Sequence, residues 1–276
     1  MKELKKNIDK KITEPFPHAE IENFLNENDV NSLFENFPDK IFETYIDPTS
    51  INNDKPDRIN INDPQLINFF KKDKIWKKII NQFTDKEFVN NLIDYFKDDF
   101  EKFNLKFKLN KYHIYKSYYF SIILPKSLSQ LLLKKLVIRY EKIKNIILRL
   151  LKIPSIRVEL YLRRSYPGYN LKAHTDQRSK FIILLFYLHD MKDEEGNDIS
   201  NLLLFKSKNN NKKDWVRHPK SENVEEVKTI NVRKNKLFLS LNSKNSLHGI
   251  KKYHSKKFRK FLYLSLTISN YDNIWE

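Results

Sequence analysis

Hydrophobic positions in the first half of the chain follow the spacing of a helix. Thr84-Asp85-Lys86-Glu87 has the form of a capping box, and apolar residues recur after it every three to four positions. This first stripe comprises Phe88, Leu92, Phe96, Phe100 and Phe103. The pattern predicts a helix whose apolar face is buried in the core.

A second helical pattern runs from Ser127 to about Leu151. Pro154 should end this helix, because proline cannot donate the next backbone hydrogen bond. The expected buried face comprises Leu128, Leu132, Leu136, Tyr140, Ile143, Ile147 and Leu150. We interpret both stripes as core-forming faces rather than cofactor sites.

Beyond Pro154 the pattern changes to short apolar runs rich in Ile, Val, Phe and Tyr and separated by Pro, Gly, Asn and Asp. The runs are Ile156–Leu162, Phe181–Leu188, Leu202–Phe205, Lys236–Leu241 and Phe261–Ile268. Their spacing predicts an antiparallel sandwich or barrel. With no repeat or Gly/Ser-rich linker, we expect one α+β domain over 1–276, in which helices of 1–153 pack on one outer face of a β core in 154–276.

The composition is that of a chain able to bury a core, with 40% hydrophobic, 13% aromatic and 32% charged residues and a mean hydropathy of −0.66. The absence of cysteine excludes disulfides, zinc–thiolate sites, iron–sulfur clusters and cysteine nucleophiles. No apolar run approaches the ~20 residues of a membrane span, and none follows the basic N-terminus as a secretory signal would. A cytoplasmic location is therefore expected.

The formal net charge of +17 raises the question of a nucleic-acid partner. However, the basic residues are mostly lysines spread along the whole chain, and Asn and Ile are also abundant. The coding bias of an AT-rich genome explains this composition better than a phosphate-binding surface does. Since no helix-turn-helix, zinc-finger or RNA-binding signature is present, neither nucleic acid nor a membrane is expected as a partner.

The three glycines all lie in the second half, at 168, 196 and 249. Gly168 stands in a turn, Tyr166-Pro167-Gly168-Tyr169, that leads toward His174, and Gly249 directly follows His248. Glycine serves where the backbone bends sharply or approaches another group closely, so both positions draw attention to these histidines.

His174-Thr175-Asp176 places an imidazole and a carboxylate two residues apart, and such residues project to the same side of an extended segment. His248 could supply a third ligand. Two imidazoles and one carboxylate form the facial triad of non-haem Fe(II) oxygenases, although a hydrolytic zinc site accepts the same ligand types. His254 is the alternative third ligand, but it stands in a basic segment that we expect to be solvated.

Arg259 begins the last apolar run and could grip a carboxylate with two parallel hydrogen bonds, which arginine does better than lysine. We favour Arg259 over the adjacent Lys260 because Arg259 shares strand parity with Phe261 and Tyr263. Four further cations flank the metal motif and could contact an anionic substrate, although the general basic bias explains them slightly better. They are Arg163, Arg164, Lys172 and Arg178.

From Ile156 to Ile268 the order of features resembles the 2-oxoglutarate/Fe(II)-dependent dioxygenase superfamily, closest to its prolyl-hydroxylase-like branch. The matching segments are Tyr166-Pro167-Gly168, His174-Thr175-Asp176, Leu185-Phe186-Tyr187-Leu188, Leu237-Phe238-Leu239-Ser240, His248-Gly249-Ile250 and Arg259. The chain departs from the family at 197–201, where a Gly-Gly is common. The resemblance implies a double-stranded β-helix (a jelly-roll, cupin-like core).

The resemblance also implies the cofactors and the roles of individual residues. His174, Asp176 and His248 would be iron ligands, and Arg259 would anchor the carboxylate of 2-oxoglutarate that lies furthest from the metal. Tyr187 matches a tyrosine that hydrogen-bonds the same carboxylate, and Tyr166 matches one near the cosubstrate and substrate. The implied reaction uses Fe(II), 2-oxoglutarate and O₂, hydroxylates a small-molecule or peptidyl substrate and releases succinate and CO₂.

Two other functions are consistent with the sequence. The first is a non-catalytic or hydrolytic metal-binding β-barrel, and the second is an oxygenase directed at nucleic acid, favoured by the charge alone. The sequence leaves open the prime substrate, the position oxidised, the oxidative outcome and the oligomeric state.

Overall fold

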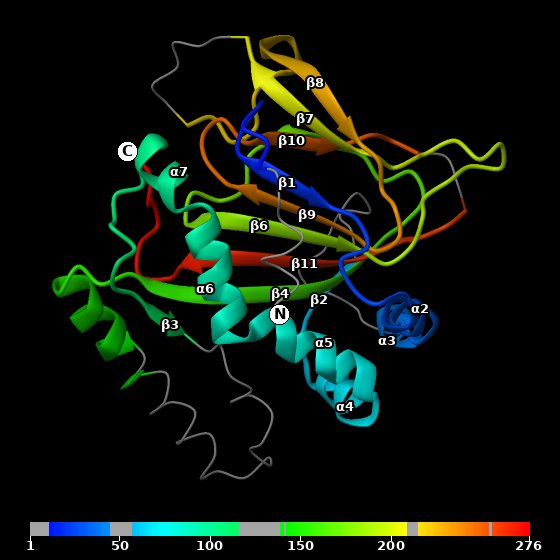
Figure 1. Cartoon of the computed structure of the whole chain (residues 1–276), viewed down its shortest axis with the longest axis horizontal. Helices are drawn as coiled ribbons and strands as arrows, with labels where there is room; N and C mark the ends of the chain where they lie inside the picture. The colour runs from blue at the N-terminus through cyan, green and yellow to red at the C-terminus, as the bar shows by residue number, and fades with distance from the viewer. Residues whose placement is uncertain (1–10, 45–56, 116–138, 141, 209–214, 254–255) are drawn as a thin grey trace.

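A computed structural model of the chain describes residues 11–44, 57–115, 139–140, 142–208, 215–253 and 256–276. Within these ranges the strands form two sheets (Figure 1). The larger sheet has seven strands in the order β1-β9-β6-β11-β4-β2, and β3 also pairs with β4. The smaller sheet has four strands in the order β5-β10-β7-β8.

The strands of the large sheet pair antiparallel except β3, which runs parallel to β4. They are β1 (His18–Ile21), β2 (Asp57–Asn60), β3 (His113–Tyr115), β4 (Ser155–Ser165), β6 (Lys180–Tyr187), β9 (Lys236–Leu241) and β11 (Arg259–Ile268). The small sheet is antiparallel throughout. Its strands are β5 (Leu171–His174), β7 (Leu202–Ser207), β8 (Val224–Ile230) and β10 (Leu247–Ile250), and a short 3-10 helix, η1 (Ser221–Asn223), precedes β8.

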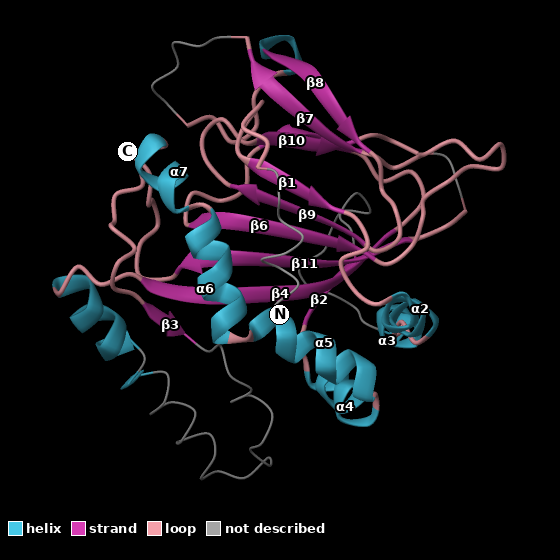
Figure 2. Ribbon diagram, in the orientation of Figure 1, coloured by secondary structure: helices cyan, strands magenta, loops and turns pink. Residues whose placement is uncertain are grey.

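Among the described residues that precede β3, six segments form helices, and Figure 2 shows them beside the strands. They are α2 (Glu27–Glu35), α3 (Asp39–Thr44), α4 (Pro64–Lys72), α5 (Lys74–Thr84), α6 (Lys86–Tyr95) and α7 (Lys97–Lys102). Asp63, Asp73 and Asp85 cap α4, α5 and α6 by accepting hydrogen bonds from free backbone N–H groups of the first turn. Asp73 ends α4 and caps α5, and Asp85 ends α5 and caps α6, so each helix begins directly after the one before it.

The alternation of side chains along β11 divides the core into two layers. Leu262, Leu264 and Leu266 pack with the helices, whereas Phe261 and Tyr263 face the small sheet. The helical layer includes Trp76, Ile79, Phe83, Leu92 and Phe96. Helices therefore cover one face of the large sheet, and the small sheet covers the other.

All five runs predicted as strands are strands, and the expectation of helices on one face of a β core is confirmed. The first part of the chain is less purely helical than expected, since it also supplies β1, β2 and β3. Strands of three or four residues carry too little alternating pattern to be recognised from sequence.

The predicted capping box at 84–87 is shifted by one residue. The N-cap of α6 is Asp85, whose carboxylate accepts from Glu87 N, whereas the Thr84 hydroxyl donates to Ile80 O at the end of α5. The stripe from Phe88 to Phe100 is buried as predicted, but it belongs to two helices that meet at Phe96.

The predicted buried face of the second helix is wrong over its described part. Residues 142–150 are helical, but Tyr140, Ile143, Ile147 and Leu150 are exposed, Leu150 by 78%. The helix lies beside β3 at the margin of the large sheet (Figure 1), where the helical layer over the sheet does not reach it. Positions 127–138 of this prediction lie outside the described residues.

Among the described residues, no helix combines the length and apolar character needed to span a bilayer.

Candidate metal centre

The small sheet brings His174 and His248 together. His174 ends β5 and His248 lies in β10, and the two residues stand directly opposite each other in the antiparallel pairing. Their ring centroids are 4.4 Å apart with an interplanar angle of 50°. Cross-strand neighbours lie this close because side chains on one face of a pair project together.

Each of these histidines has its ring orientation fixed by a backbone carbonyl. His174 Nδ1 lies 3.0 Å from Lys172 O, and His248 Nδ1 lies 3.0 Å from Ser246 O. Because a carbonyl only accepts, Nδ1 carries a proton in both rings, so the neutral form of each ring has its lone pair on Nε2. This is the tautomer and the supporting hydrogen bond found in histidine ligands of metals.

Asp176 stands just beyond β5 and completes the group. Its Oδ2 lies 3.9 Å from His248 Nε2 and accepts a hydrogen bond from Tyr263 Oη at 3.3 Å. Lys180 Nζ lies 3.8 Å from the other carboxylate oxygen and donates to Tyr263 Oη at 2.8 Å. One carboxylate therefore touches both a histidine and a cationic side chain.

Electrostatics keep the imidazole of His174 neutral and Asp176 ionised. Burial, assisted by the neighbouring His248, lowers the pKa of His174 to about 3. Burial alone would raise the pKa of Asp176, but Lys180 and the two histidines lower it to about 2. At neutral pH His174 and Asp176 thus have the protonation states that metal ligands require.

The three side chains do not stand as a closed ligand set. In the ranges that the structure describes, no group of three or more His, Asp or Glu side chains is already arranged to hold an ion. Asp176 instead contacts Lys180 and Tyr263. The donor types and protonation states fit a metal ion, whereas coordination would require the three side chains to draw together.

Arg259 lies in the interior at the start of β11, with none of its surface exposed. Its Nη2 donates to Tyr187 Oη at 3.0 Å, while Nε and Nη1 are buried without a hydrogen-bond partner among the described residues. A buried guanidinium without a counter-charge is costly. The unused donors of Arg259 fit the two oxygens of a carboxylate.

The neighbouring Lys260 points to the other face of the sheet, where its Nζ forms an ion pair with Asp39 at 2.6 Å. Arg259 and Lys260 thus point to opposite faces of β11, as their alternation along the strand predicts. Tyr166 lies in the turn after β4, where its ring is 6.4 Å from that of Tyr169 and its backbone oxygen accepts from Tyr253 Oη. The alternative ligand His254 lies outside the described residues.

Sequence reasoning missed the segment that covers the ligand motif. Thr175 Oγ1 accepts from Trp215 Nε1 at 2.6 Å, and Thr175 N donates to Arg217 O at 2.9 Å. The ring of His218 stacks on that of His174 with centroids 5.8 Å apart. His218 has no partner nearby in sequence, so only the folded chain identifies it as a neighbour of the site.

Gly249 allows β5 and β10 to approach closely. A Cβ at this position would lie 2.5 Å from Leu171 O and 3.1 Å from a ring carbon of Phe205. Since a backbone oxygen cannot move aside without breaking the pairing, any larger residue would displace the strand that carries His248. The attention drawn to this glycine by the sequence thus has a steric basis.

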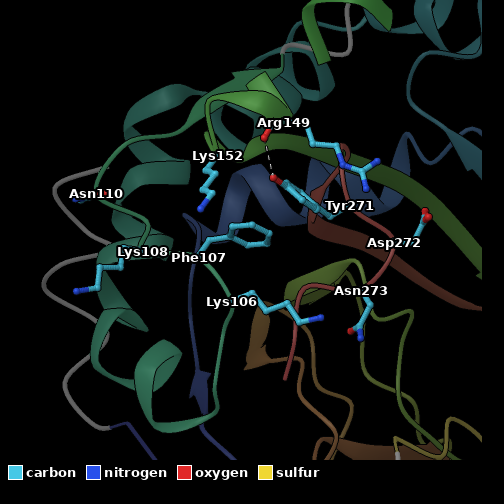
Figure 3. Close-up of a pocket in the computed structure, with 9 residues that line it drawn as sticks. All are labelled: Lys106, Phe107, Lys108, Asn110, Arg149, Lys152, Tyr271, Asp272 and Asn273. Atoms are coloured by element: carbon cyan, nitrogen blue, oxygen red, sulfur yellow. Dashed lines mark hydrogen bonds between the residues drawn. The ribbon is translucent and has the colours of Figure 1, made fainter. Parts of the chain in front are cut away.

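A separate pocket of about 860 Å³ lies between the segments 106–110, 149–152 and 271–273 (Figure 3). Its walls include Phe107 and Tyr271, whose rings are 4.4 Å apart. The close-up shows lysine side chains at its rim. None of the residues that form the candidate metal centre lines this pocket.

No family model matches the sequence, and no curated protein matches it. Solved structures give weak likenesses. A prolyl 4-hydroxylase of Phytophthora capsici has 13% identity and a TM-score of 0.49, with 93% of this chain and 60% of that chain covered. This chain thus spans less than two thirds of that structure.

Two further structures are similar to a comparable degree. A Trichoplax adhaerens prolyl hydroxylase in complex with a hypoxia-inducible-factor peptide has 11% identity and a TM-score of 0.44, over 91% of this chain and 83% of that one. HygX of Streptomyces hygroscopicus, with nickel and 2-oxoglutarate bound, has 12% identity and a TM-score of 0.45, over 94% and 85%. At these values the likenesses do not establish a shared activity.

Proposed function

We propose that this protein is an Fe(II)- and 2-oxoglutarate-dependent oxygenase that hydroxylates a small-molecule or peptidyl substrate. One observation carries the proposal: His174, His248 and an ionised Asp176 cluster in a fold that also holds a buried arginine, Arg259, without a carboxylate partner among the described residues. A metal-binding barrel would need the first feature but not the second. We further propose that 1–276 forms a single domain around a double-stranded β-helix.

His174 and His248 would hold the iron through Nε2, and Asp176 through its carboxylate. Two imidazoles and one carboxylate leave the remaining coordination positions open, which is the arrangement that non-haem iron oxygenases use. Bound iron supplies the activation of O₂ and the oxidation of the cosubstrate to succinate and CO₂. The chain's own residues bind, orient and shield the reacting groups.

Arg259 and Tyr187 would bind the far carboxylate of 2-oxoglutarate. The Tyr187 hydroxyl already orients Arg259, and the aromatic rings of Tyr187 and Phe261 lie 5.1 and 4.9 Å from its guanidinium carbon. These contacts hold the guanidinium in place before the ligand arrives, which reduces the ordering cost of binding. The role of Tyr166 near the cosubstrate remains part of this proposal.

Tyr263 and Lys180 would position the carboxylate of Asp176. Both contact its carboxylate, and Lys180 also donates to Tyr263. Lys180 helps to keep the aspartate ionised while no metal neutralises it, and Tyr263 orients the carboxylate through its hydrogen bond. Lys180 therefore serves as the positioning residue of the ligand set.

The decisive experiment is anaerobic addition of Fe(II) and 2-oxoglutarate while the visible spectrum is recorded. We expect a charge-transfer band for the wild-type protein and none for His174→Ala. Absence of the band in folded wild-type protein, or an unchanged band in His174→Ala, contradicts the proposal. Zinc binding without 2-oxoglutarate binding would instead favour a hydrolytic or non-catalytic barrel.

A further inference from the structure

Arg163 is a partly buried cation that forms no ion pair with any of the described residues. It lies in β4 opposite Phe261 of β11, and its guanidinium carbon is 5.7 Å from the ring of Phe261 and 5.5 Å from that of Tyr263. Its Nε is buried and has no hydrogen-bond partner in the part of the chain that the structure describes, although the residue as a whole is partly exposed. Stem and ring contacts thus hold the guanidinium while the rest of its fork stays accessible.

Three other arginines near the ligand motif already have partners. Arg164 points to the opposite face and lies 3.4 Å from Asp39, and Arg178 donates to Trp215 O at 2.6 Å. Arg157 pairs with Glu159 on the same face of β4 as Arg163. Among the described residues, no carboxylate or carbonyl forms a hydrogen bond or ion pair with Arg163, so the general basic bias of the chain does not account for its placement.

A second arginine stands beside it. Arg58 of the edge strand β2 is the cross-strand partner of Arg163, so both side chains lie on one face of the sheet. Arg58 is exposed at the sheet margin. Like charges directly opposite each other destabilise a strand pair, and an anion between the two guanidiniums would turn this repulsion into attraction.

The balance of charges around the site also favours an anion at Arg163. Lys180 offsets Asp176, and the two carboxylates of the cosubstrate would offset the metal ion. Arg259 would bind one of those carboxylates. The positive charge of Arg163 would then have no negative charge left to balance it. Burial also lowers the pKa of Arg163, as expected for a charge held away from water, while the nearby Asp176 opposes that shift.

We propose that Arg163 and Arg58 form a subsite for a carboxylate or phosphate group of the prime substrate. The inference rests on the oxygenase function proposed above and names its substrate class as acidic. Arg163 holds the anionic group beside Tyr263, one side chain removed from Asp176, and Arg58 attracts it at the margin of the sheet. Arginine suits both oxyanions because its planar fork makes two parallel hydrogen bonds.

Calorimetric titration of the full chain with inorganic phosphate, and separately with acetate, tests the subsite without metal or cosubstrate. We expect one saturable site for at least one of the two probes, and the preferred probe indicates a phosphorylated or a carboxylated substrate. Arg163→Gln should weaken binding at least about tenfold, because a charge-assisted pair is lost, and Arg58→Gln several-fold. Arg157→Gln is the matched control on the same strand face and should bind as the wild type does.

Unchanged binding in folded Arg163→Gln, or no saturable binding of either probe by the wild type, overturns the subsite. Loss of binding in Arg259→Gln but not in Arg163→Gln also overturns it, because the anion would then occupy the cosubstrate arm. If Arg163→Gln does not fold, Arg163→Lys keeps the charge without the fork and should still bind more weakly. Since no metal is present, the result is independent of the charge-transfer test of oxygenase function.

Discussion

Arg259 donates a hydrogen bond to Tyr187 across the strand pair β6–β11, and both side chains are fully buried. The two remaining side-chain nitrogens of Arg259 have no partner within the described residues. We expect Arg259→Gln to weaken 2-oxoglutarate binding at least about tenfold, the size of a lost charge-assisted interaction. Tyr187→Phe should have a smaller effect in the same direction. Anaerobic calorimetry of the metal-loaded protein measures both.

Lys260→Gln is the control for this prediction, because Lys260 pairs with Asp39 on the opposite face. Its affinity for 2-oxoglutarate should match that of the wild type. An equal loss in the Lys260 and Arg259 variants would show that the anchor has been assigned to the wrong residue.

Metal addition should raise the stability of the protein through His174, Asp176 and His248. Any ligand that binds the folded state alone stabilises it, by about 2.7 kcal/mol at a concentration 100 times its Kd. Thermal melts with and without Mn(II) should separate, and a chelator should reverse the shift. His174→Ala should abolish the shift, whereas His189→Gln should retain it; equal shifts in both variants would argue against the ligand assignment.

Gly249→Ala should destabilise the fold by about 1–3 kcal/mol, the usual cost of overpacking, and should weaken metal binding through the displaced β10. The added Cβ meets Leu171 O at 2.5 Å. Denaturant titration measures the first effect and metal titration the second. Gly196→Asn is the comparison. A Cβ at Gly196 would meet no atom within 4 Å, and Asn tolerates the positive φ of 87° at this position. Stability and metal affinity should therefore stay close to those of the wild type.

His189 should make stability depend on pH. Burial, more than any other cause, lowers the pKa of His189 to about 4, while its Nε2 accepts from Lys260 N at 3.1 Å. The unfolded chain therefore binds a proton near the ordinary pKa of about 6.5, before the folded chain does. Stability from His189 is complete above that pH and falls as the pH drops toward 4.

Denaturant titrations between about pH 7 and pH 4 should show this loss in the wild type and a smaller loss in His189→Gln. The difference between the two proteins isolates His189 from the other carboxylates and histidines that titrate in the same window. Parallel profiles for the two proteins would exclude the effect.

Two leucines test the arrangement of the helices. Leu184 is fully buried between β6 and the helical layer, whereas Leu150 is 78% exposed. Leu184→Ala should cost about 2–5 kcal/mol in the free energy of unfolding. Leu150→Ala should stay within about 0.5 kcal/mol. A large cost for Leu150→Ala would mean that the face predicted from the sequence is buried after all.

The sequence by itself determined the strands with long apolar runs and the identity of the candidate ligands. Alternation over eight or ten residues is a strong local signal, and β6 and β11 carry it. His174 and Asp176 are neighbours in sequence, so their spacing alone places them together. The parity of Arg259 with Phe261 followed from the same two-residue period of a strand.

Only the tertiary structure decided which distant residues meet. The register of β5 against β10 brings His248 opposite His174, and the pairing of β2 with β4 brings Arg58 opposite Arg163. The prediction of a buried face at 140–150 was wrong for the same reason. Periodicity tells which side of a helix is apolar, but not whether another layer covers it. Long-range pairing depends on packing and chain entropy over the whole molecule, and no local window of the sequence contains that information.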